Sequence, residues 1–401
     1  MKNTNDIREV SMETNNNNFD EGKSVLTRSP IITNIALGQG GYNSMRAMLD
    51  YPSCSPENCF AINYEADLKS AHLIDDKNKI TLPGYGAGHD RAKAQTDLLR
   101  DVKQLIQEDL AKKINPKTDK IYIHVAGGGG CGSGIAAIVA GLVSNDGFIA
   151  GRVGRRLPVE VILYKPADTT DASNVGEWQN FNECLKEFDT LVQKQAIAVY
   201  IADLSTSPND NPVERNTEVN REVAALLYRF DCLNFLSNYS NLDFEDRYKL
   251  SVTPGVRGIL KFNPVDKSYS SPFVLPNGGH CRRIGYEIQE NTEQVMLSIT
   301  KTLGVEALDK SFGGLYPEKS VSIGAFPFVI YSGYEVPISL KAKSQSTVSE
   351  LEKKRQNLIK AEQSQGKDAY DKLKANRQAM DEANSMNNMD INDLLACFDN
   401  D

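Results

Sequence analysis

The sequence lacks the features that would place the chain in a membrane or direct it out of the cell. None of its apolar runs approaches the roughly 20 residues that a helix needs to cross a bilayer. Its first residues are polar and contain no apolar core like that of a secretory signal. We therefore expect a protein that works in the cytoplasm.

The cysteines favour neither a disulfide framework nor a zinc site. The seven cysteines are scattered along the chain, and their number is odd. The one close pair, Cys54 and Cys59, has no second Cys or His pair to complete four zinc ligands. This pattern is typical of reduced thiols inside the cell. The sequence predicts no metal site built from protein ligands alone.

An excess of positive charge is also missing. The 45 Lys and Arg residues are outnumbered by 53 Asp and Glu residues, which gives a net charge of −8. A chain with this balance has no broad electrostatic attraction for nucleic acid or anionic lipid. We therefore expect neither direct nucleic-acid binding nor membrane binding. The 401 residues are enough for two domains of ordinary size.

After residue 30, strand-like apolar runs alternate with segments of helical periodicity. The strand-like runs are 31–37, 58–62, 120–126, 158–164 and 197–202. The helical segments are 41–50, 90–113, 134–143 and 176–194. Such alternation predicts an α/β fold whose parallel sheet is covered by helices on both faces.

The remaining segments differ from this pattern and from one another. A long helix is expected near 212–237, because apolar residues recur at helical spacing at Val219, Val223, Leu226, Leu227, Phe230 and Leu233. The predicted units are a polar arm or short helix over 1–30, the parallel-sheet domain over 31–210, a central helix over 211–240, a loop over 241–249, a second α+β domain over 250–342, an exposed charged helix over 343–386 and an acidic tail over 387–401.

The sharpest local feature is a run of glycines between a strand and a helix. Six of the eight residues in Gly127-Gly128-Gly129-Gly130-Cys131-Gly132-Ser133-Gly134 are glycines. Such a loop can turn several backbone N–H groups toward one point, and the helix behind it adds the positive end of its dipole. The alternative is a tight turn without a ligand, but so dense a glycine run is costly in conformational entropy. The loop therefore predicts a phosphate site.

Two further glycine clusters stand next to predicted elements: one follows the strand-like run over 31–37, and the other precedes the helical segment over 90–113. They are Gly38-Gln39-Gly40-Gly41 and Gly84-Tyr85-Gly86-Ala87-Gly88. Neither contains the lysine of a Walker loop, and Asn43 stands where the dinucleotide fingerprint requires a glycine. Three glycine loops at the carboxyl ends of strands in one α/β unit predict a polyphosphate site.

The glycine loops resemble those of the tubulin/FtsZ superfamily. Gly128-Gly129-Gly130-Cys131-Gly132-Ser133-Gly134 is similar to the signature Gly-Gly-Gly-Thr-Gly-Ser/Thr-Gly, with Cys131 in place of threonine. Gly38-Gln39-Gly40-Gly41 resembles the first nucleotide loop of that family, and Gly86-Ala87-Gly88 resembles the loop that contacts the γ-phosphate. Asn63 begins a triplet that stands where FtsZ has Asn-Thr-Asp. The resemblance covers about residues 31–340 and implies that the domain over 31–210 binds GTP or GDP.

The resemblance also implies a catalytic segment. Asn241-Leu242-Asp243-Phe244-Glu245-Asp246 resembles the FtsZ motif Asn-x-Asp-Phe-x-Asp. In that family the segment reaches the nucleotide of the neighbouring subunit, which implies that Asn241, Asp243 and Asp246 position the attacking water. Phosphoryl transfer mainly requires such positioning and charge stabilisation, with Mg²⁺ offsetting the phosphate charge. An acidic loop that caps a helix is the alternative for these residues taken in isolation.

Three more positions correspond to nucleotide contacts in the family. Asn220 matches the asparagine whose amide reads the guanine edge, and an amide supplies both a donor and an acceptor. Asp203 stands where the family usually has a second guanine-contacting asparagine, and Glu177 is expected near the ribose. No arginine follows Lys165-Pro166 before Arg215, so the arginine contact that FtsZ makes there is absent or replaced.

The C-terminal region is similar to that of the TubZ and PhuZ group of plasmid and phage tubulin-like proteins. A charged helix leads almost directly into Asp390–Asp401, a short acidic segment with a small apolar cluster. The group implies head-to-tail filaments in bacterial cytoplasm that segregate or position DNA or phage particles, with a DNA-bound adaptor protein as partner. The tail either docks on the neighbouring subunit or only solubilises the chain.

Three other functions are weighed against this one. An FtsZ-type filament for cell division would differ mainly in its cellular role. A tubulin-like structural protein without hydrolysis is disfavoured by the presence of Asp243 and Asp246. A dinucleotide-dependent oxidoreductase would require a complete glycine fingerprint and an acidic ribose ligand about 20 residues further on, and neither glycine loop provides this pattern.

Overall fold

The computed structural model describes residues 28–101, 104–145, 147–232, 235, 244–287, 292–304, 306–307 and 327–387. The predicted N-terminal arm therefore lies almost wholly outside the described residues, and so does the acidic tail beyond Asn387. Among the described helices, none has both the length and the apolar character of a membrane span.

One large mixed sheet organises the protein. Its strand order is β10-β12-β7-β6-β5-β4-β1-β2-β3, and β8 pairs with β7 at the side. The strands are β1 Ile32–Leu37, β2 Cys59–Tyr64, β3 Lys79–Leu82, β4 Lys120–Ala126, β5 Val159–Lys165, β6 Ala198–Asp203, β7 Gly255–Asn263, β8 Ser268–Ser270, β10 Arg283–Glu287 and β12 Phe328–Tyr334. A separate parallel pair joins β9, His280–Cys281, to β11, Glu306–Ala307. From β3 to β7 every pairing is parallel, as the alternation of strands and helices predicts.

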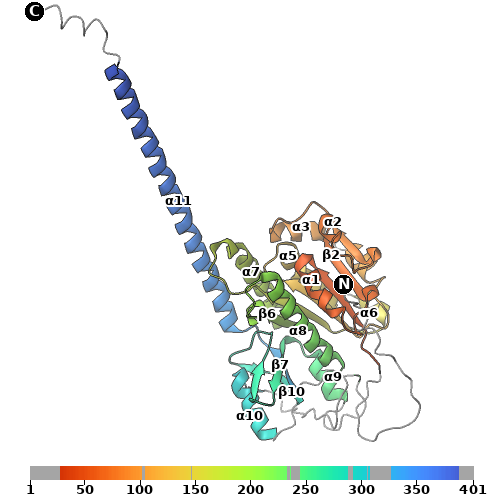
Figure 1. Cartoon of the computed structure of the whole chain (residues 1–401). Coiled ribbons are helices and arrows are strands. Elements are labelled where there is room, and N and C mark those ends of the chain that lie inside the picture. Colours follow the sequence, from red (N-terminus) through yellow and green to blue (C-terminus); the bar gives the residue numbers. More distant parts are fainter. Residues whose placement is uncertain are drawn as a thin grey trace, which may run out of the picture.

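The helices lie on both faces of this sheet (Figure 1). They are α1 Gly38–Met48, α2 Glu65–Leu68, α3 Arg91–Arg100, α5 Cys131–Asn145, α6 Gly147–Val153, α7 Val175–Gln193, α8 Pro212–Cys232, α9 Phe244–Val252, α10 Thr292–Leu303 and α11 Ile338–Asn387. The predicted α/β fold with a parallel sheet, a long central helix and a second α+β unit is confirmed.

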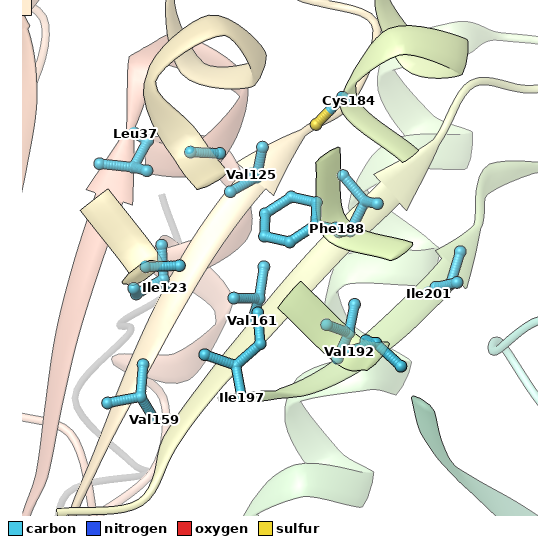
Figure 2. Close-up of a cluster of buried hydrophobic side chains, with 14 of the residues drawn as sticks. Leu37, Ile123, Val125, Val159, Val161, Cys184, Phe188, Val192, Ile197 and Ile201 are labelled. Carbon is cyan, nitrogen blue, oxygen red and sulfur yellow. The ribbon is translucent and has the colours of Figure 1, made fainter. Parts of the chain in front are cut away.

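Two hydrophobic cores fill the space between the sheet and its helices. In β4, Ile121, Ile123 and Val125 pack into the core that α5 and α7 cover, whereas Tyr122 points into the core under α8. Figure 2 shows the first core, where Phe188 and Val192 of α7 lie over the strands. Strands that are buried on both faces read as continuous apolar runs, which is why five of them are visible in the sequence.

The weaker elements differ from the prediction. The sequence did not predict β3, because its four residues include only Ile80 and Leu82 as apolar positions and it is an edge strand. The single helix expected over 90–113 is divided, since α3 ends at Arg100 and a π-helical segment follows over Leu105–Leu110. The predicted loop over 241–249 is corrected in part, because α9 already begins at Phe244.

The second α+β unit continues the same sheet. β7 pairs in parallel with β6, and β12 and β10 follow as antiparallel neighbours. The last helix, α11, begins at Ile338, five residues before the predicted start. It packs on α7 through its first turns, where Leu340 and Leu351 are buried, and then projects far beyond the body of the protein (Figure 1).

Candidate functional site

The glycine loops after β1 and β4 meet at the middle of the parallel sheet. These two strands are neighbours, and the strand order reverses between them, since β2 and β3 lie on one side and β5 and β6 on the other. Ligands of open α/β sheets bind at the carboxyl ends of strands at such a switch point. The loop after β1 continues into α1 and the loop after β4 leads into α5.

A cavity of about 850 Å³ opens above this point. Its size is within the usual range for small-molecule sites. Twelve of the predicted nucleotide-binding residues line it, namely Gly38, Gln39, Gly40, Asn63, Ala87, Gly88, Gly128, Gly129, Gly130, Cys131, Gly132 and Glu177. The cavity thus joins all three predicted glycine loops to Asn63 at the end of β2 and to Glu177 on α7.

Close backbone contacts explain why two of these positions are glycines. Gly38 has a φ of +68°, and a Cβ atom there would lie 2.8 Å from the backbone nitrogen of Gly132. A Cβ atom on Gly130 would lie 2.4 Å from the Cα atom of His89. Such distances leave no space for a side chain. The glycine loop after β4 therefore packs directly against each of the other two loops.

The sequence did not predict Asn180 of α7, which connects two of the loops. Its Nδ2 atom donates to the carbonyl of Gly128 at 3.1 Å and to the carbonyl of His89 at 3.2 Å. Arg91 holds the same region, because its Nη1 atom donates to the carbonyl of Asn180 at 2.8 Å. Asparagines on helices are common, so no sequence signal distinguished this one.

Cys131 lies in the cavity wall at the position where threonine is usual. Burial, with a smaller contribution from Asp67, raises the pKa of its thiol to about 12. The thiol therefore stays protonated, and it is neither a nucleophile nor a thiolate ligand near neutral pH. Ser133 is turned away from the cavity and donates to the carbonyl of Gly129.

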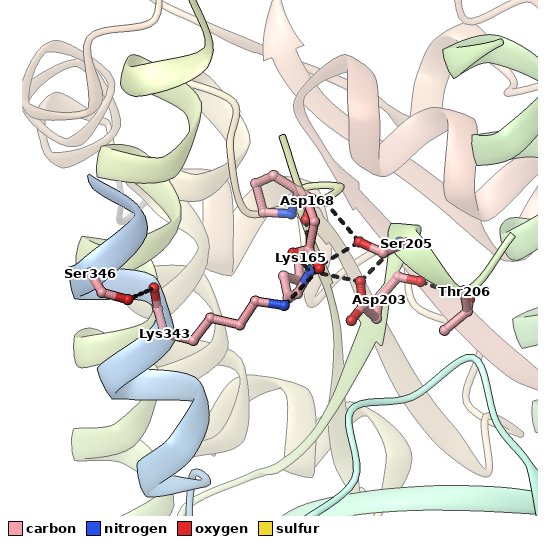
Figure 3. Close-up of polar contacts among 8 residues, drawn as sticks. Lys165, Asp168, Asp203, Ser205, Thr206, Lys343 and Ser346 are labelled. Carbon is pink, nitrogen blue, oxygen red and sulfur yellow. Dashed lines mark hydrogen bonds and ion pairs between the residues drawn. The ribbon is translucent and has the colours of Figure 1, made fainter. Parts of the chain in front are cut away.

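The sequence predicted a nucleotide contact for Asp203, but Asp203 does not line the cavity. Its carboxylate accepts from Lys165 Nζ at 2.7 Å and from the backbone N–H of Ser205 at 2.9 Å. Lys165 also donates to Asp168 at 2.9 Å, and the other oxygen of Asp168 accepts from Lys343 of α11 at 2.6 Å (Figure 3). Asp203 thus helps to hold a buried lysine beneath the cavity.

Asn220 is also outside the cavity lining. Its amide donates to the carbonyl of Asn43 at 3.4 Å. One turn earlier on α8, Arg215 and Asn216 do line the cavity, and the side-chain oxygen of Asn216 is buried without a hydrogen-bond partner. A spacing of four residues places Asn216 on the same helix face as Asn220. This spacing is the signal that could have identified Asn216.

The other predicted residues fall into two groups. Gly41, Gly86 and Gly134 belong to the three loops but do not line the cavity. Asn241 and Asp243 lie outside the described residues. The backbone of Asp246 belongs to α9, but its side chain is not among the described ones. The structure therefore leaves the predicted roles of these carboxylates as predictions.

Several solved structures share this architecture. The tail-truncated TubZ of Clostridium botulinum phage c-st is 19% identical, with a TM-score of 0.61 over 82% of this chain and 100% of its own. A GTPγS-form protofilament of TubZ from Bacillus thuringiensis serovar israelensis is 18% identical, with a TM-score of 0.61 over 85% of this chain and 95% of its own. A GTPγS-bound protofilament of CetZ2 from Haloferax volcanii is 15% identical, with a TM-score of 0.59 over 81% and 99%.

The chain has the tubulin-like fold of TubZ. No protein-family model and no curated protein matches its sequence. The tubulin-like fold was nevertheless visible in the sequence, because the glycine loops that carried the resemblance are the segments that meet at the switch point.

The charges around the cavity of this tubulin-like fold suit a metal-bound polyphosphate. Among the described residues that line it, Arg215 is the only cation, whereas Asp67, Asp168, Asp171 and Glu177 are acidic. No group of three or more His, Cys, Asp or Glu side chains in the described part of the chain could hold a metal ion. Mg²⁺ typically uses one or two carboxylates together with substrate phosphates. Asp67 and Gln39, which line the cavity, carry side-chain oxygens of the hard type that Mg²⁺ prefers.

Proposed function

We propose that this protein is a GTPase that assembles head to tail into filaments and hydrolyses GTP between subunits. The observation that carries the proposal is the cavity at the switch point, where three glycine loops meet in a tubulin-like fold. Two of the similar structures are protofilaments in a GTPγS form. The cavity is thus in the right place, and its walls have the right chemistry, for a guanine nucleotide.

The phosphates would lie on the loop over Gly128–Gly132 at the start of α5. Backbone N–H groups and the positive end of the helix dipole bind the anion there without a lysine. Mg²⁺ would be held by the phosphates with Asp67 and Gln39, and it would supply the charge that offsets the acidic wall. Asn216 and Arg215 at the start of α8 would meet the base, because an amide can pair with both a donor and an acceptor of guanine.

The length of α8 supports hydrolysis between subunits. Its first turns line the cavity at the carboxyl ends of the strands. Its last turn reaches the amino-terminal ends of the strands, where Asp231 pairs with Lys120, the first residue of β4. A helix of 21 residues is about 31 Å long. Asn241, Asp243 and Asp246 follow that far end, so they would act on the cavity of the next subunit in a head-to-tail, open-ended array.

The proposed role is the segregation or positioning of plasmid DNA or phage particles in bacterial cytoplasm, through a DNA-bound adaptor protein. The support for it is the likeness to the TubZ structures, one of which comes from a phage. The alternative of FtsZ-type cell division predicts the same chemistry with a different cellular location.

The decisive experiment measures GTP turnover per molecule as a function of protein concentration. Because the cavity and the carboxylates would belong to different subunits, turnover per molecule should rise steeply above a critical concentration. Asp243→Ala should bind GTP as the wild type does and form filaments that persist. A turnover per molecule that is constant down to high dilution would contradict the mechanism, and so would Asp243→Ala filaments that disassemble as fast as wild-type filaments.

A further inference from the structure

A cluster of buried charges lies at the amino-terminal ends of the parallel strands, whereas the cavity lies at their carboxyl ends. Lys120 Nζ is 2.8 Å from a carboxylate oxygen of Asp231 and 3.0 Å from one of Glu160, and Arg257 Nη1 donates to the same Glu160 oxygen at 2.5 Å. Each of these four side chains is at most 6% exposed. The cluster joins β4, β5 and β7 to the last turn of α8.

The cluster holds both ends of the segment that carries the expected catalytic residues. Asp231 is the second-last residue of α8, which ends at Cys232. At the other end, Arg257 Nη2 donates to the carbonyl of Thr253, the residue that follows α9, at 2.9 Å. The chain between these anchors includes Asn241, Asp243 and Asp246. One ion cluster therefore links the end of α8, which precedes the segment over 233–252, to Thr253, which follows that segment.

Stability alone does not account for these charges. Burial raises the pKa of Asp231 to about 6, and the neighbouring Glu160 adds to this effect, although Lys120 and the Tyr122 hydroxyl favour the charged form. Burial thus costs this carboxylate more than its partners return. Buried ion clusters of this kind are often no more stabilising than apolar residues of the same volume, but they do impose a defined geometry.

We propose that Lys120, Glu160, Asp231 and Arg257 form a clamp that positions the segment over 233–252 for hydrolysis in the neighbouring subunit. This inference rests on the proposed function. The four residues touch neither the cavity nor its ligand, so they are positioning residues. Their effect would appear in turnover within the filament and not in nucleotide affinity.

The test compares Asp231→Asn and Lys120→Met with the wild type. Each variant should bind GTP with a dissociation constant within about twofold of the wild-type value, because the cavity is at the other end of the parallel strands. Turnover per polymerised subunit should fall about tenfold or more, since a misplacement of the order of 1 Å can cost up to about a hundredfold. Unchanged turnover per polymerised subunit would overturn the proposal, and so would a loss confined to GTP affinity.

Lys79→Met is the matched control. Lys79, like Lys120, is the first residue of a parallel strand. It pairs with a single carboxylate, that of Asp76 at 2.7 Å, whereas Lys120 pairs with two. It lies on the edge strand β3, away from the cluster. Its replacement should leave turnover per polymerised subunit unchanged. A reduction equal to that of Lys120→Met would show that the loss of any strand-end lysine has this effect, and would overturn the proposal.

Hydrogen exchange separates this proposal from the proposed function. In Asp231→Asn, the amides of α9 should exchange faster than in the wild type while those of β4 to β6 keep their protection, because only the clamped segment is released. This result would support the clamp even if the wild type hydrolysed no GTP, in which case only the proposed function would fail. Equal loss of protection across the sheet would instead show a purely structural role. If Asp231→Asn does not fold, Arg257→Lys keeps the charge but loses the forked contact, and serves in the same comparison.

Discussion

At the residue scale, a buried histidine lies behind the loop after β1. His124 of β4 is about 1% exposed and lies between Ser44 Oγ, 3.0 Å from Nδ1, and Asn34 Oδ1, 3.0 Å from Nε2. Burial lowers the pKa of its imidazole to about 3. The ring is therefore neutral, with one nitrogen as donor and the other as acceptor, and it supports the backbone against which Gly41 packs.

This histidine should make the fold sensitive to mild acid. The unfolded chain takes up a proton on His124 below its ordinary pKa of about 6.5, whereas the folded protein does not until about pH 3. The stability from this group is therefore complete above pH 6.5 and is lost as the pH falls, at about 1.4 kcal/mol per pH unit. His124→Gln keeps a donor and an acceptor, so its free energy of unfolding should fall less steeply between pH 6.5 and 4.5.

Urea unfolding of both proteins across this pH range provides the measurement. Acidic residues shared by the wild type and the variant contribute equally and cancel in the comparison. His72→Gln, which removes an exposed histidine, controls for the loss of a histidine as such. Parallel pH profiles for the wild type and His124→Gln would contradict the argument.

At the scale of elements, α11 is held to the body by a few apolar contacts and is then oriented by charge. Leu351 is 2% exposed and belongs to the core that α7 covers, whereas Leu358 two turns later is 58% exposed. The ion pair of Lys343 with Asp168 connects α11 to the cavity wall, but both side chains are 48% exposed, so screening leaves it a small contribution to stability. The contact orients the helix more than it stabilises it.

Leu351→Ala should therefore loosen the base of α11. Removing a buried leucine side chain costs about 2–5 kcal/mol, and here the cost falls on one element. Limited proteolysis should cut the first turns of α11 faster in Leu351→Ala than in Leu358→Ala, which removes the same side chain from an exposed position. Equal cleavage rates for the two variants would show that the apolar contact does not hold the helix.

The elements also show what the sequence could reveal. The two-faced burial of β1, β2, β4, β5 and β6 gives apolar runs that are easy to recognise, and the glycine loops follow directly from them. The short edge strand β3 and the start of α9 have no comparable signal. The sequence pointed to Asn220, but Asn216 is the asparagine of α8 that lines the cavity. Which of the two faces the cavity depends on where α8 begins and how it is rotated, and a resemblance by motif spacing does not specify either. The pairing of Asp203 with Lys165, outside the cavity lining, had no sequence signal for a similar reason, because it depends on the packing of neighbouring strands.

At the scale of the whole molecule, the cavity lies at the carboxyl ends of the parallel strands and the last turn of α8 lies at their amino ends. Under the proposed mechanism, a subunit that has lost its cavity would still offer its carboxylates, and a subunit that has lost Asp243 would still offer its cavity. This separation predicts complementation. Gly130→Trp should block the cavity, because even a Cβ atom at this position would lie 2.4 Å from His89, and Asp243→Ala should remove the carboxylate. Each variant alone should hydrolyse little GTP.

Mixing the two variants in equal amounts should restore part of the activity. In a randomly mixed head-to-tail array, about a quarter of the interfaces pair an intact cavity with an intact carboxylate segment. Phosphate release should therefore rise toward a quarter of the wild-type rate at the same total polymer, which sedimentation measures in parallel. A mixture of Asp243→Ala with Asp246→Ala is the control, since both variants lack part of the same segment and can form no intact interface. If the first mixture stayed as inactive as the control while both proteins entered the polymer, hydrolysis would have to be completed within one subunit.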